Sequence, residues 1–189
     1  MTALRTDVAA LYVDKNGCYP KLVEHWFDEA RDARTYAGPW PVVAHPPCGP
    51  WTRNAFASRQ DPECGRIAFR QVREFGGVLE QPAHSRLFDD CRAPRPGELP
   101  DSFGGYTIMV RQVDWGHVAP KATWLYLVRC APRGSPPARR PTHWCRKRPG
   151  QTVPDGIKMC SAQQRRRTPV AFAEWLLDLA AQARRTEAA

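Results

Sequence analysis

Short apolar runs alternate with helix-type patterns along this chain of 189 residues, and that alternation restricts the folds open to it. The runs with strand character lie at 7–14, 41–45, 78–80, 106–113 and 123–128. The helical patterns lie within 19–34, between 61 and 76, and from 168 toward the end of the sequence. Strands that alternate with helices are typical of an α/β sheet, so we expect one α/β domain over 1–189.

Two of the predicted helices carry clear end signals. Asp61 suits the capping position of the first, Pro62 its first helical position and Gly76 its end. Thr168 and Pro169 have the same two roles at the start of the last helix. The apolar residues on one face of that helix are Phe172, Trp175, Leu176 and Leu179. We expect this face to pack in the core.

The composition is that of an ordinary globular protein, with 42% hydrophobic and 25% charged residues, and excludes a disordered chain. No uncharged apolar stretch approaches the roughly 20 residues needed to cross a bilayer. The first residues lack a long apolar segment, so we expect no secretory signal and a cytoplasmic location, in the host cell if a phage encodes the protein. Seven cysteines without a CxxC pair do not suggest a disulfide framework.

Positive charge is concentrated in one part of the sequence. The net charge is +9, and the segment from Arg129 to Arg167 holds eleven basic residues and one acid. Recurring prolines mark 131–160 as a basic, irregular insert within the domain. The basic residues that we expect to contact nucleic acid here are Arg146, Lys147, Arg148, Arg165 and Arg167, next to the aromatic rings of His143 and Trp144. A charge run is often only a solvated face, but this mixture favours a surface that binds phosphates and stacks on bases.

The run His45-Pro46-Pro47-Cys48-Gly49-Pro50-Trp51 follows a predicted strand directly. Two prolines stiffen the backbone before Cys48, and a glycine after it permits close approach of a ligand. This context suits a nucleophile, although a buried structural thiol is the alternative. Glu80 ends another predicted strand, so its carboxyl group is expected at the same edge of the sheet. We expect partial burial to raise the pKa of Glu80, which would let it protonate a ring nitrogen while sulfur attacks the ring.

Four blocks of the sequence resemble a known family when they are taken in order. They are the Pro-Pro-Cys turn, Leu79-Glu80-Gln81-Pro82, the stretch from Val113 to Leu125 with Gly116, Pro120 and Lys121, and Arg167-Thr168-Pro169 with Phe172. Together they resemble the motifs of DNA cytosine-C5 methyltransferases, in particular short phage-type relatives that carry HPPC and ENP. The blocks span about residues 42 to 175.

The resemblance implies a reduced Rossmann-like, methyltransferase-type sheet with helices on both faces. It also implies that Cys48 adds to C6 of a pyrimidine, that Glu80 engages N3, and that C5 takes a methyl group from S-adenosylmethionine. Lys121 would contact an anion or the base. Trp51 and Arg53 would line the pocket for a base flipped out of DNA.

The same resemblance assigns cofactor contacts to Asp14, Gly17, Asp32 and Pro46. The glycine-rich loop expected after the first strand is replaced by Asp14-Lys15-Asn16-Gly17. Because only about 30 residues separate Gly17 from Cys48, we expect the second strand, with its ribose-binding acid, to be missing or compressed. No large target-recognition domain follows, so sequence specificity is expected to be weak or supplied by a partner protein.

Three alternatives stay open at this point. The chain can be a degenerate methyltransferase fold that binds DNA without turnover, in which case Tyr19 or Trp26 should fill the cofactor pocket. It can also be an enzyme that modifies free pyrimidine nucleotides. Finally, His143, Cys145 and Cys160 with Cys130 or His117 can supply four zinc ligands, although the paired spacing typical of zinc sites is absent.

Overall fold

Short, wholly buried strands form the centre of the molecule. The computed structural model describes residues 3–52, 55, 58–134, 136–144, 152 and 156–187. The strands of its main sheet are β1 (Arg5–Leu11), β2 (Val23–Phe27), β3 (Val42–Ala44), β4 (Gly77–Pro82), β5 (Tyr106–Arg111) and β6 (Ala122–Val128). All three residues of β3 are fully buried, as expected for a parallel strand covered on both sides.

The six strands form one mixed sheet in the order β2-β1-β3-β4-β6-β5. Strands β1 to β4 run parallel to one another, whereas β6 is antiparallel to both β4 and β5. The protein is therefore a mixed α/β structure, as predicted. All five predicted strands, at 7–14, 41–45, 78–80, 106–113 and 123–128, correspond to strands of the sheet, namely β1, β3, β4, β5 and β6, with shifted ends.

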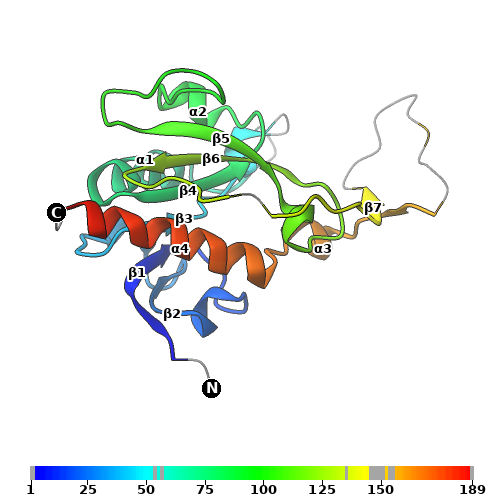
Figure 1. Cartoon of the computed structure of the whole chain (residues 1–189), viewed down its shortest axis with the longest axis horizontal. Coiled ribbons are helices and arrows are strands. Elements are labelled where there is room, and N and C mark those ends of the chain that lie inside the picture. Colours follow the sequence, from blue (N-terminus) through cyan, green and yellow to red (C-terminus); the bar gives the residue numbers. More distant parts are fainter. Residues whose placement is uncertain are drawn as a thin grey trace.

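Two helices cover opposite faces of the sheet (Figure 1). Helix α4 (Val170–Glu187) packs on β1, β3 and β4 through buried Phe172, Leu176 and Leu179, which confirms the predicted apolar face. Helix α1 (Glu63–Phe75) packs on β3, β4 and β6 from the other side. Successive side chains of the central strands point to opposite faces of the sheet, one toward α4 and the next toward α1. No helix in the described part of the chain is both long and apolar enough to cross a membrane.

The prediction of a helix within 19–34 is wrong. A single 3₁₀ turn at Tyr19–Lys21 is followed by strand β2, which pairs in parallel with β1. The second strand is therefore compressed but present. Its composition, Val-Glu-His-Trp-Phe, is rich in β-branched and aromatic residues, and the short connection after Pro20 leaves no room for a helix of normal length.

Smaller elements complete the chain. They are α2 (Leu87–Asp90), α3 (Ala162–Arg166), 3₁₀ turns at Ala33–Thr35, Gly49–Trp51 and Gln112–Trp115, and the strands β7 (His143–Trp144) and β8 (Lys158–Met159). The described part of the predicted 131–160 insert contributes β7 and β8, which pair in parallel as a separate two-stranded sheet. Figure 1 shows β7 set apart from the six-stranded sheet.

The junction between α1 and β4 depends on two glycines. Gly76 ends the helix, as predicted, and Gly77 begins the strand at a φ of +111°. A Cβ atom on Gly77 would lie 2.1 Å from the carbonyl oxygen of Val42 in the neighbouring strand. Only glycine allows β4 to approach β3 this closely.

We therefore expect Gly77→Ala to destabilise the protein by about 3 kcal/mol or more, because an unfavourable φ and a backbone collision add together. The matched control is Gly97→Ala, where φ is +90° but no atom lies within 4 Å of the added methyl group. It should lose only about 1–2 kcal/mol. Urea denaturation measures both changes, and equal losses would contradict the role given to the β3–β4 approach.

Candidate active site

Three parallel strands end at one edge of the sheet. Leu11, Ala44 and Leu79 lie level with one another across β1, β3 and β4. The residues one step further along, among them His45 and Glu80, therefore emerge side by side. The order of the strands in the sheet also reverses here, because β2 lies on one side of β1 and β3 lies on the other. Open α/β sheets bind their ligands at such a point, outside the carboxyl ends of the strands.

Both carboxylate oxygens of Glu80 are held by neighbouring side chains. The Nδ1 atom of His45 lies 3.2 Å from Oε2, and the Nε2 amide of Gln112 donates to Oε1 over 2.9 Å. The side chains of His45 and Glu80 are each 13% exposed. Since Val43 and Val78 belong to the core beneath α4, strand alternation places His45 and Glu80, two residues further on, on that same side.

The electrostatic surroundings keep Glu80 ionised. Burial acts to raise the pKa of Glu80, but the hydrogen bond and charge of His45, together with the charge of Lys121, outweigh it and lower the pKa below its usual value. The sequence-based expectation of a raised pKa is thus wrong. Burial alone suggested it, and the sequence did not indicate that His45 lies against the carboxylate.

The turn that carries Cys48 is fastened to strand β4. The buried amide of Gln81 donates to the carbonyl oxygen of Pro46 over 2.6 Å, and Ser85 donates to the other end of the same amide. On the far side of the turn, the amide of Gly49 donates to the side chain of Gln60. Gln81 therefore fixes the distance between the Cys48 turn and the strand that bears Glu80.

Cys48 is exposed, and its thiol is protonated at neutral pH. Loss of water around the sulfur raises its pKa, and the negative charge of Glu80 raises it further. Lys121 and Arg166 act in the opposite direction but do not reverse the shift. A reaction through this sulfur must therefore begin with loss of the thiol proton.

Lys121 lies at the same edge of the sheet, directly before a strand that runs in the opposite direction. It precedes β6, which runs antiparallel to β4, so the start of β6 lies beside the end of β4. Its Nζ donates to the carbonyl oxygen of Arg167 over 3.1 Å, and its charge acts on both Cys48 and Glu80. The structure thus brings together the three residues that we predicted to be catalytic.

A basic rim lies next to Cys48 and Lys121. We define this rim as the exposed residues Arg165, Arg166 and Arg167. They end α3, whose position is set by buried His117, because Nε2 of this ring lies 2.9 Å from the carbonyl oxygen of Gln164. Arg166 acts on Cys48, although the sequence pattern did not single it out. The other residues predicted to contact nucleic acid, Arg53, Arg146, Lys147 and Arg148, lie outside the described residues.

A pocket of about 420 Å³ opens beyond the carboxyl ends of β1 and β2. Its lining consists of Val13, Asp14, Lys15, Asp28, Glu29 and Ala30. Asp14 was predicted to bind a cofactor, whereas Asp28 and Glu29 were missed because β2 was taken for a helix. The sequence does contain a signal for Asp28 and Glu29, because these two acids directly follow an apolar run.

Gly17 closes a tight turn with Asp14, which is one of the residues that line this pocket. Its amide donates to the carbonyl oxygen of Asp14 over 2.8 Å, and a Cβ atom on Gly17 would lie 3.0 Å from that oxygen. The Asp14 carboxylate accepts the amide of Asn16. Neither Tyr19 nor Trp26 is among the lining residues, so the obstruction expected of a degenerate binding protein is not found.

Gly17, Asp32 and Pro46, three of the four residues predicted to bind the cofactor, are not among the lining residues of the pocket. Asp32 begins the 3₁₀ turn at 33–35 and pairs with Arg34 through both carboxylate oxygens, at 2.7 and 3.0 Å. Arg34 thus occupies the carboxylate of Asp32 that was expected to contact the cofactor. Pro46 is buried, and Gln81 occupies its carbonyl oxygen.

The prediction that Trp51 lines a base pocket is also wrong. Its side chain is 7% exposed and lies in the core beneath α1, beside Leu87 and next to Gly65. The 3₁₀ turn at Gly49–Trp51 directs the indole inward, and the sequence contained no signal for that direction.

The zinc alternative gains no support from the described residues, in which no group of three metal-ligating side chains gathers. Both ring nitrogens of His117 lie against backbone groups of Ala119 and Gln164. Cys145 lies outside the described residues.

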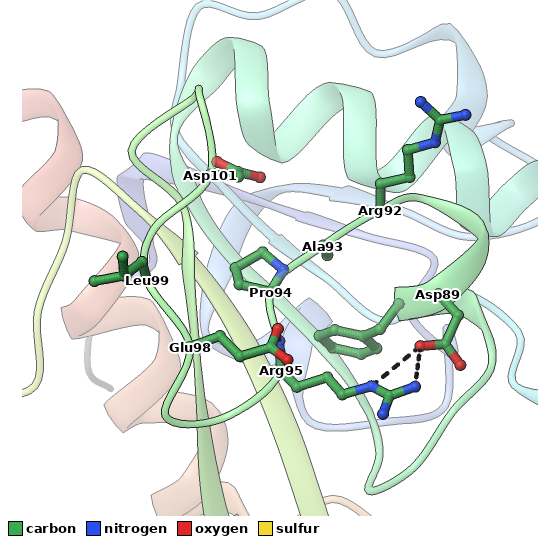
Figure 2. A pocket seen from close by; sticks show the side chains of 9 residues that line it. Asp89, Arg92, Ala93, Pro94, Arg95, Glu98, Leu99 and Asp101 are labelled. Carbon is green, nitrogen blue, oxygen red and sulfur yellow. Dashed lines mark hydrogen bonds and ion pairs between the residues drawn. The ribbon is translucent and has the colours of Figure 1, made fainter.

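A second hollow, of about 440 Å³, follows α2 and contains none of the predicted site residues (Figure 2). Arg95 turns toward Asp89 there and donates two hydrogen bonds to one oxygen, at 2.7 and 3.2 Å. The backbone amide of Arg95 also donates to Glu98. The charges on this surface thus largely satisfy one another.

No family model, no curated protein and no solved structure matches this chain. The interpretation of the site therefore depends on its geometry and on the sequence motifs.

The electrostatic coupling of Cys48 can be measured by alkylation with iodoacetamide. We expect Glu80→Gln to lower the pKa of Cys48 and to speed its alkylation at pH 7.5 by roughly threefold to tenfold, because a shift of half to one pH unit changes the thiolate fraction that much. Lys121→Met should slow the reaction. Peptide mass spectrometry reports each cysteine separately.

Cys64 is the internal control, since its charged neighbours are Asp61, Arg34 and Asp32 and both variants leave them in place. Equal rates at Cys48 in all three proteins would show that Glu80 and Lys121 do not act on the sulfur.

Proposed function

We propose that the protein modifies C5 of a pyrimidine in DNA, as a cytosine-C5 methyltransferase-like enzyme that uses Cys48 as its nucleophile. The observation that carries this proposal is the convergence of Cys48, Glu80 and Lys121 on one sheet edge, beside an acidic pocket at the ends of β1 and β2. The sequence resemblance had pointed to Cys48, Glu80 and Lys121 before the fold was considered.

The chemistry begins with transfer of the thiol proton of Cys48 to solvent water. The sulfur then forms a bond to C6 of the ring, N3 takes up a proton, and the electron pair displaced from the C5–C6 double bond makes C5 nucleophilic. After methyl transfer, water accepts the protons from C5 and N3, and the sulfur leaves C6 with its electron pair, which restores the double bond and the free cysteine. Glu80, held ionised and in one orientation, accepts a hydrogen bond from the N4 amino group and from N3 once N3 is protonated, while Lys121 offsets negative charge that develops on the ring.

S-adenosylmethionine would supply the methyl group, and the pocket has the chemistry to hold it. Its charged lining is Asp14, Lys15, Asp28 and Glu29, which sums to a negative charge. Carboxylates accept hydrogen bonds from ribose hydroxyls and attract the ammonium and sulfonium groups of this molecule. The same carboxylates repel phosphates, which disfavours a nucleotide with a phosphate chain as the occupant.

The topology also supports the proposal. The resemblance implies a reduced Rossmann-like sheet, and the six strands form one mixed sheet in which β1 to β4 run parallel and β6 lies antiparallel between β4 and β5. Helices cover both faces, as expected for that type of sheet. The small size of the basic insert agrees with weak sequence specificity or with a partner protein that supplies it.

DNA is the favoured partner because the basic rim lies next to Cys48. Arg165, Arg166 and Arg167 are exposed, and Arg166 acts electrostatically on Cys48. Arginine side chains bind phosphates of a nucleic-acid backbone, and a duplex hides C6 of its bases, so the target base must be flipped out or lie in a single strand.

Calorimetric titration with S-adenosylmethionine tests the cofactor assignment. We expect binding at micromolar affinity, weakened about tenfold or more in Asp28→Asn/Glu29→Gln, because two carboxylates that contact the ligand lose their charge. Glu24→Gln, an exposed change on β2 outside the pocket, is the control and should bind normally. No binding by any of the proteins would remove this donor from the proposal.

Covalent trapping on DNA that contains 5-fluorocytosine tests the nucleophile, because fluorine at C5 blocks the final elimination. With S-adenosylmethionine present, the natural protein should form an adduct that withstands denaturing electrophoresis. Cys48→Ser should form none while retaining its DNA affinity. Cys64→Ser is the matched control and should trap normally. DNA binding without trapping in the natural protein would instead favour a binder without turnover.

A further inference from the structure

A chain of polar side chains leads from the core to Glu80, and the resemblance to methyltransferases does not account for it. The Oη of Tyr19 lies 2.6 Å from Nε2 of His45, and Nδ1 of the same ring lies 3.2 Å from Oε2 of Glu80. Gln112 holds the other carboxylate oxygen and also donates to Thr123 over 3.0 Å. Tyr19 is 4% exposed and Gln112 is fully buried, so water does not compete for these bonds.

The ionised carboxylate settles the direction of the bond between His45 and Glu80. Glu80 can only accept, so Nδ1 of His45 carries a proton and donates to it. Burial raises the pKa of Tyr19 well above its usual value, so its hydroxyl keeps its proton while it contacts Nε2 of the same ring. Each nitrogen of the imidazole thus has its own partner.

We propose that His45 and Gln112 are positioning residues that fix Glu80 as a singly oriented carboxylate, with His45 itself oriented by Tyr19. The four side chains come from four separate parts of the chain, namely the turn after β1, the end of β3, the end of β4 and the turn after β5. This arrangement leaves the outward lone pairs of the carboxylate for a substrate. It deepens the proposed function, because the orientation of Glu80 matters only if a ligand meets it.

Other groups also face Glu80 and must be kept constant in any test. Lys121 stands at the start of β6 and stabilises the carboxylate, while Cys48 lies on the turn after β3 and senses its charge. Thr123, on β6, contacts Gln112 and donates to the carbonyl oxygen of Lys121. Each of these groups is unchanged in the variants chosen below.

Two substitutions of His45 separate its two nitrogens. In His45→Asn the side-chain amide takes the place of Nδ1 and can still donate to Glu80, although the contact with Tyr19 is lost. In His45→Gln the amide takes the place of Nε2, so the contact with Tyr19 can persist while the donor to Glu80 is lost. The readout is the ¹³C NMR titration of the Glu80 carboxyl carbon in the full-length protein, assigned by its absence in Glu80→Gln.

We expect the midpoint of Glu80 to lie below the usual glutamate value in the natural protein and to stay low in His45→Asn. In His45→Gln it should rise by about one to two pH units, because a hydrogen bond to the charged form is lost. Gln112→Met should also raise it, and this variant keeps the test decisive if His45→Gln does not fold. Equal midpoints in the natural protein, His45→Gln and Gln112→Met would overturn the proposal, as would equal rises in His45→Asn and His45→Gln.

The titration needs neither DNA nor a methyl donor, so its outcome is separate from that of the proposed function. A low midpoint that depends on the Nδ1 donor, in a protein that never traps DNA, would refute the enzyme while leaving the positioning role intact. In an active enzyme, the acid limb of the trapping rate against pH should move upward in His45→Gln and remain in place in His45→Asn. A trapping profile unchanged in His45→Gln would show that the orientation of Glu80 does not serve the reaction.

Discussion

The parallel pairing of β3 with β1 on one side and with β4 on the other determines the rest of the structure. Only three residues make up β3, yet they set Leu11, Ala44 and Leu79 level with one another and bring the following residues to a common edge. The close approach of β4 at Gly77 is part of the same constraint. A shift of one residue in the pairing of β3 with β4 would turn His45 and Glu80 to opposite faces of the sheet, because side chains alternate along a strand.

The parts of this arrangement that depend on local patterns could be predicted from the sequence. Apolar runs located β1, β3, β4, β5 and β6, and the rule that ligands gather at carboxyl ends placed Cys48 and Glu80 together. Features set by long-range packing could not be predicted. The strand β2 reads as a helix because its residues fit both periods over so short a length, and the acids that follow it were missed for that reason.

Orientation and ionisation were the least predictable properties of the site. Trp51 lies three residues after Cys48, but the path of one 3₁₀ turn directs its ring into the core. The pKa of Glu80 depends on whether burial or its partners dominate, and the main partner, His45, is 35 residues away in the sequence. His45 belongs to the HPPC run, yet nothing in the sequence indicated which carboxylate its side chain would contact.

The acidic pocket and the basic rim lie along one sheet edge and carry opposite charge. For a polyanion such as DNA, this separation acts as a steering field: the backbone is attracted toward Arg165, Arg166 and Arg167 and turned away from Asp14, Asp28 and Glu29. A nucleic-acid strand would therefore be aligned before any base contact forms, with its phosphates beside the arginines and away from the acidic pocket. Added salt would weaken this alignment together with the binding itself, so that selectivity in the direction of approach is lost along with affinity.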